Sequence, residues 1–126
     1  MTPPADPALT GPSAPSDGEA LAAAAERDLA EVPAAEVVAA AAVHLMSAAA
    51  VKCGLAEEGR ELQDLDEARK LITALAGLVT AARPDLGVHA APLRDGLQAL
   101  QRAFREASRE QDAPGEGPGE KLTGPV

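Results

Sequence analysis

The sequence of 126 residues is almost without aromatic side chains: it holds one Phe, no Tyr and no Trp. Base stacking, the caging of cations and anchoring at a membrane interface all depend on aromatic rings. We therefore do not expect any of these activities to be the main role of the chain.

Signals for secretion and for membrane insertion are also missing. The single cysteine, Cys53, cannot form an intramolecular disulfide, and no basic segment followed by an apolar stretch stands at the N-terminus. The longest uncharged stretch, residues 37–51, is mostly alanine and is shorter than the roughly 20 residues that a helix needs to cross a bilayer. We expect a cytoplasmic protein that does not enter membranes.

Motifs for catalysis or cofactor binding are absent as well. The glycines of residues 115–119 follow no strand and precede no predicted helix, so they do not form a nucleotide loop. Asp64, Asp66 and Glu67 suit the start of a helix better than a calcium loop. No serine nucleophile motif is present. We expect no enzyme, no cofactor and no bound metal.

Charge is unevenly distributed along a chain whose formal net charge is −9. Residues 1–36 carry seven acidic residues against one arginine, whereas residues 68–111 carry seven basic residues against four acidic ones. The overall sign repels a phosphate backbone, so nucleic acid is an unlikely partner unless the basic part is displayed alone.

Both ends of the chain are rich in proline or glycine. Residues 1–16 contain five prolines and one large apolar side chain, and residues 112–126 contain repeated glycines and prolines. Such segments bury too little apolar surface to offset the entropy lost on ordering. We expect two disordered tails, 1–16 and 112–126, around a helical domain at 17–111.

Helical patterns fill that domain, and no stretch alternates with a period of two. Helix starts and stops divide it into segments of about 18–32, 33–53, 64–82 and 92–110, with proline, glycine or a capping residue at the boundaries. The sequence predicts an all-α fold: a small bundle of three main helices, with a possible extra helix at the N-terminus.

The segment 33–53 is apolar on every side, which is typical of a helix that is covered all round. One stripe along it alternates spacings of four and three, as in a close-packed helix pair. We call this stripe the seam; it consists of Val37, Ala41, His44, Ala48, Val51 and Leu55. Two amphipathic neighbours cannot cover such a helix, so we expect a homodimer joined through the seam.

His44 is the most reactive residue type in the seam, because an imidazole titrates near neutral pH and can act as a base, a ligand or a switch. The alternative is a hydrogen-bonded histidine that fixes the register of a buried helix contact, and we favour it. Cys53 lies near a helix C-terminus, where nothing activates a thiol, and we interpret it as a small buried apolar residue.

Four arginines fall within about a quarter turn of one another on the last predicted helix. We call them the arginine stripe: Arg94, Arg102, Arg105 and Arg109. The stripe could meet RNA phosphates or an acidic partner. It could equally be a solvated face whose ion pairs contribute about 0–1 kcal/mol each, which is the interpretation that we favour.

Three blocks of the sequence closely resemble a known family. They are VHLMSAAAVKCGLA at 43–56, DLDEARKLITALAGLVTAA at 64–82 and APLRDGLQALQRAFREAS at 91–108. The resemblance is to the actinobacterial branch of the family called domain of unknown function 1844, and it covers roughly residues 28–109. Where that family has an aliphatic residue, this chain has Cys53. The family has no assigned activity, and the resemblance implies genes near those for a translation initiation factor and ribosomal proteins.

Together these features predict a small cytosolic interaction or accessory protein that acts through contacts with an unknown protein partner and has a link to translation. Two alternatives stay open. The first is a nucleic-acid-associated factor that uses the arginine stripe, and the second is an enzyme or ligand carrier centred on His44.

Overall fold

A computed structural model describes residues 16–126, which divide into two units at the bond between Val32 and Pro33. The expected disordered tail at 1–16 lies outside the described residues, apart from Ser16. The first unit holds one described helix and the second unit holds all the others.

Helix α2 (Asp17–Glu31) belongs to the first unit. It begins with the predicted capping box, in which the Ser16 hydroxyl accepts from the Glu19 N–H and the Glu19 carboxylate accepts from the Ser16 N–H. None of its residues is buried, and Leu21 and Leu29 are largely exposed. The helix is therefore held by its own cap and backbone hydrogen bonds rather than by a core.

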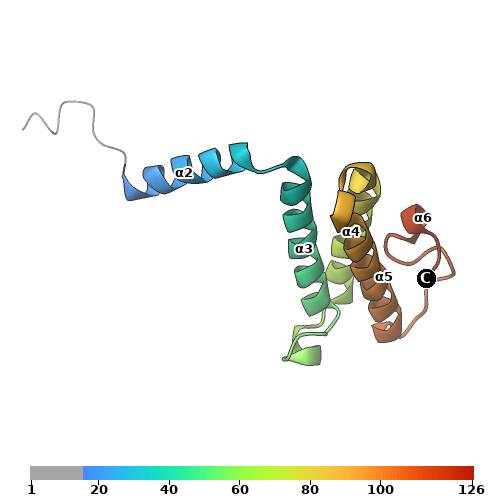
Figure 1. The fold of residues 1–126 in the computed structure, drawn as a ribbon. Coiled ribbons are helices and arrows are strands. Elements are labelled where there is room, and N and C mark those ends of the chain that lie inside the picture. Colours follow the sequence, from blue (N-terminus) through green and yellow to red (C-terminus); the bar gives the residue numbers. More distant parts are fainter. Residues whose placement is uncertain (1–15) are drawn as a thin grey trace, which may run out of the picture. The chain divides into compact units, whose positions relative to one another are not determined.

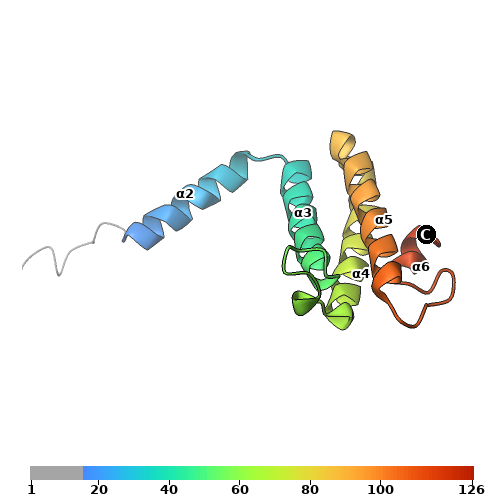
Figure 2. The same ribbon diagram turned by 90° about the horizontal axis from the view of Figure 1, so that it is seen from below.

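The second unit is built on α3 (Ala34–Lys52), α4 (Leu65–Ala82) and α5 (Ala90–Ala107), which lie side by side (Figure 1, Figure 2). Short turns η1 (Gly59–Leu62), η2 (Arg83–Asp85) and η3 (Gly87–His89) connect them, and a short helix α6 (Glu120–Thr123) follows. Residues 16–126 contain helices and turns but no strand. The all-α prediction is confirmed.

Local signals set the ends of these helices as the sequence indicates. Gly54 has φ 86° after α3, and the N–H groups of Gly54 and Leu55 donate to the carbonyls of Val51 and Ala50, which is a Schellman motif. The Asp64 carboxylate accepts from the Glu67 N–H at the start of α4. Capping thus fixes both sides of the connection between α3 and α4.

The core of the second unit combines small residues of α3 with large ones of α4 and α5. Helix α3 contributes alanines that lie at the contact with its neighbours, so the helix backbones approach closely. The large buried side chains come from the other helices and from the turn before α5: Ile72, Leu75, Leu86, Leu93, Leu97, Leu100 and Phe104. The core face of α3 comprises Ala39, Ala42, Ala49 and Cys53.

Helix α3 is not covered on all sides within the single chain, as expected from the small number of neighbouring helices. Only Ala39, Ala42 and Ala49 are buried within the helix, and the seam faces away from α4 and α5. An all-apolar helix gives no periodic signal that selects its core face. In the structure that face places Ala39, Ala42 and Ala49 at its centre, with Leu45 and Met46 partly buried beside them. His44 is exposed in the single chain rather than buried.

The expectation of a disordered C-terminal segment also differs from the structure. Residues 112–126, which we call the C-terminal hook, turn back onto the domain, and α6 contacts α4 (Figure 1). Gly117, Pro118, Gly119 and Glu120 are buried. Few apolar side chains are needed here because charged and polar side chains of α5 hold the hook, a long-range effect that local composition does not reveal.

Candidate functional site

The seam forms an exposed apolar face on α3. The side chains of Val37 and Leu55 at its two ends are 42% and 60% exposed, and Ala41 and His44 between them are also exposed. Ala48 and Val51 are half-buried. The six predicted interface residues therefore share one surface of the single chain, as their spacing indicates.

The geometry of an α-helix places the seam opposite the core. At 100° per residue, the centre of the seam lies about half a turn from the centre of the core face of α3. Val43, which is 52% exposed, lies on a different side of α3, about a third of a turn from the centre of the seam. One helix thus carries two apolar faces, of which α4 and α5 cover only one.

Charged groups stand only at the ends of this face. Glu36 lies in the first turn of α3 and Lys52 in the last, which is the favourable arrangement for the helix dipole. The Glu36 carboxylate lies 2.8 Å from Nε2 of His89, which ties the start of α3 to η3. Because residues 37–51 carry no formal charge, an apolar surface could cover the face without burying an ion pair.

Chemical reactivity is sparse in this region. Burial raises the pKa of the Cys53 thiol, so the nucleophilic thiolate is disfavoured. His44 has no hydrogen-bond or ion-pair partner among residues 16–126, and no three His, Cys, Asp or Glu side chains gather there in a cluster that could hold a metal. The exposed residues of the seam are therefore mostly apolar, with His44 as the one polar side chain among them.

The arginine stripe does not remain a continuous free surface. Arg105 turns inward and its guanidinium donates to both carboxylate oxygens of Glu120, at 3.0 and 2.7 Å. Arg94 donates to Asp95, and Arg102 and Arg109 are exposed. A basic surface for phosphates thus loses its central member to the C-terminal hook.

The burial of two polar residues was not predicted from the sequence. Gln101 lies on the core side of α5 and is fully buried, and Glu120 is 2% exposed in the hook. No local pattern predicts that either residue is buried, because the burial of each depends on a partner far away in the sequence. The one available signal was Gln101 itself, a polar residue beside Leu97, Leu100 and Phe104 on the apolar side of α5.

Helix α3 is long and apolar enough to cross a membrane by length and composition alone. Its 18-residue window has a mean hydropathy of 1.7, and 17% of the window is buried inside the structure. Core helices of soluble proteins often have the same length and composition, so these two properties alone do not identify a membrane span. Whether α3 is a core helix or a membrane span, its seam is the side that α4 and α5 leave exposed.

Comparison with known proteins gives one match, to a family model. No curated protein and no solved structure significantly matches the chain. One family model does match, over residues 34–106, which run from the first residue of α3 almost to the end of α5. The match leaves out α2 and the C-terminal hook and covers more than half of the chain. The chain therefore belongs to the family described as Domain of unknown function (DUF1844).

Proposed function

We propose that this protein is a homodimeric interaction module whose two copies meet through the seam on α3. The observation that carries the proposal is the uncharged apolar face that α4 and α5 leave uncovered. Contiguous exposed apolar surface of this kind commonly marks a protein contact. The family match covers the whole of α3, which supports a contact in the part of the chain that the family model describes rather than at its ends.

A second copy is the partner that fits this face. A two-fold contact brings the same surface of both copies together, so it must be complementary to itself. Ala41 and Ala48 are small enough to let two helices approach closely, and the absence of charge between residues 37 and 51 avoids repulsion of like charges. In such a dimer the two His44 side chains lie near the symmetry axis and can fix the register of the helices.

Paired charge substitutions test the dimer. Ala41→Glu places a carboxylate in the seam at a position exposed in the single chain, so the protomer should fold and the dimer should dissociate. Ala74→Glu adds the same charge at an exposed position of α4, outside the seam, and should leave the dimer intact. Light scattering coupled to gel filtration reads the mass of each. Equal masses for the two variants would contradict the proposal.

The role that we propose for the dimer is that of a cytoplasmic accessory protein with a protein partner, without catalysis and without a cofactor. The scarcity of reactive groups supports this role, and the translation link and the actinobacterial origin rest on the sequence resemblance. Co-sedimentation with ribosomal subunits in a sucrose gradient tests the translation link. Free protein at the top of the gradient at low and at moderate salt would argue against it.

A further inference from the structure

The C-terminal hook is held on α4 and α5 by two ion pairs and by hydrogen bonds. In one pair Arg69 of α4 donates to the Asp112 carboxylate at 2.9 Å. Arg105 binds the Glu120 carboxylate with two donors and also donates to the carbonyls of Asp112 and Ala113. The side-chain amide of Gln101 donates to the Pro118 carbonyl at 3.0 Å. Charge-assisted pairs of this kind give directional recognition of a carboxylate.

The hook contributes no residue to the buried apolar core cluster. The buried core cluster runs from Ala39 to Phe104 and contains no residue of the segment 112–126. The family match likewise ends at residue 106, before the hook begins. Leu122, the large apolar residue of α6, is 52% exposed. The hook therefore occupies a surface between α4 and α5, which we call the groove, where Gly119 lies against Ala76 and Gln101.

Three features of the hook define what the groove accepts. Gly119 has φ 73°, and a Cβ at this position would lie 2.6 Å from the Cβ of Ala76, so both its conformation and its close approach require glycine. Glu120 supplies the carboxylate for Arg105. Leu122 then lies beside Gly77 of α4. The hook residues that contact the groove thus have the pattern Gly-Glu-any-Leu, at 119–122.

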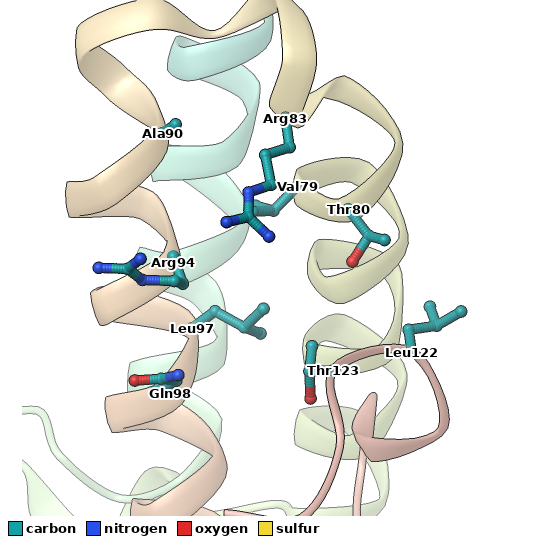
Figure 3. A pocket seen from close by; sticks show the side chains of 9 residues that line it. All are labelled: Val79, Thr80, Arg83, Ala90, Arg94, Leu97, Gln98, Leu122 and Thr123. Carbon is teal, nitrogen blue, oxygen red and sulfur yellow. The ribbon is translucent and has the colours of Figure 1, made fainter.

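The hook fits this groove incompletely. Oε1 of Gln101 is buried and has no hydrogen-bond partner among the described residues, although buried acceptors are normally satisfied. A cavity of about 170 Å³ continues between α4 and α5 past Leu122 and Thr123, where Arg83 lies over Val79 (Figure 3). Arg83 has no ion-pair partner within residues 16–126. A ligand with one more donor and one more acidic group would match the groove better.

We propose that the groove between α4 and α5 is a peptide-binding site for an acidic segment of a partner protein, and that the C-terminal hook is its tethered competitor. The partner segment carries the Gly-Glu-any-Leu pattern and reaches Arg105 with its glutamate. This site lies on helices other than α3, so it does not depend on the dimer proposed above.

The test measures binding of a fluorescent synthetic peptide with the sequence of residues 112–126 to the full chain. A tethered segment acts at an effective concentration of about 1 mM, so the parent should bind the free peptide weakly. Glu120→Gln and Gly119→Ala each loosen the hook without changing a groove residue. Both variants should bind the peptide at least about tenfold more tightly than the parent does.

Matched controls separate recognition of the carboxylate from a general effect of charge. Glu116→Gln in the chain removes an exposed carboxylate that lies 3.9 Å from Lys121, and it should leave peptide binding at the parent level. A peptide carrying Gln in place of Glu120 should bind the opened variants at least about tenfold more weakly, because the Arg105 contact is lost.

Three results would overturn the proposal. The first is equal peptide affinity for the parent, Glu120→Gln and Gly119→Ala. The second is loss of helical circular dichroism in both hook variants, which would make the hook a part of the fold. The third is a fall in oligomeric mass on Glu120→Gln, which would mean that the groove holds the hook of a second copy. The α3 dimer predicts no change of mass in that variant.

Discussion

Ala49→Leu tests whether α3 meets its neighbours through small side chains. Ala49 is fully buried on the core face of α3, which packs against α4. Leucine adds an isopropyl group where no space is left, so the helices must move apart or side chains must leave their preferred rotamers. Overpacking of this kind costs about 1–3 kcal/mol.

That cost translates into a clear thermal shift. For a domain of this size, each kcal/mol lowers the midpoint of unfolding by about 4–8 °C, so Ala49→Leu should lower it by roughly 5–20 °C. Thermal melts followed by circular dichroism at 222 nm measure the shift. Ala74→Leu introduces the same side chain at an exposed position of α4 and should change the midpoint by less than about 3 °C. A midpoint for Ala49→Leu as high as that of Ala74→Leu would refute this packing.

Three further predictions concern single groups. Gly96→Ala should destabilise the parent because the new Cβ meets the end of the Met46 side chain. In a Met46→Ala background the same substitution should stabilise the fold by about 0.5–1 kcal/mol. Urea unfolding of the parent, the two single variants and the double variant measures both effects. Burial raises the pKa of Glu120, but hydrogen bonds from Arg105 and from the Gly115 N–H outweigh it, so its folded pKa lies below the ordinary value. The Arg105–Glu120 ion pair is therefore complete above the ordinary glutamate pKa, about 4.3, and is lost as the pH falls through the lower folded pKa. Amide NMR signals of the hook should then show its release from α5 below about pH 4.3. Release already near pH 6 would contradict the ion pair as the group that holds the hook. The Cys53 thiol should react with a thiol reagent far more slowly in buffer than in denaturant, since it is buried with a raised pKa; equal rates would show that the site is open.

The sequence predicts the helices well because their signals are local. The Ser16 capping box, the Asp64 cap and Gly54 each act within a few residues, and the structure has a helix boundary at each of them. The large apolar residues of α4 and α5 repeat with helical spacing, so their buried faces could also be predicted.

Two parts of the structure could not be predicted from local patterns. Helix α3 is apolar on all sides, so periodicity did not decide whether Ala42 or Ala41 faces the core; the approach of α4 and α5 decides it. The C-terminal hook has a composition typical of disorder, and its order depends on Arg105 and Gln101, which lie many residues away on α5. Long-range polar pairing leaves no periodic trace in a sequence.

The same limit applies to the seam. Its residues could be grouped from their spacing because they share one helix face, and the structure places them together on the exposed side of α3. A contact between two molecules cannot be derived from the spacing of residues in one chain or from the structure of one chain. The seam dimer therefore stays a prediction.

Sedimentation equilibrium of the unmodified protein tests the seam dimer most directly. The chain mass is 12.7 kDa, so the proposed dimer has twice the mass of the single chain at micromolar concentration. On dilution the mass should fall toward that of the chain, as a reversible two-fold contact requires. A mass of 12.7 kDa at micromolar concentration would contradict the seam dimer.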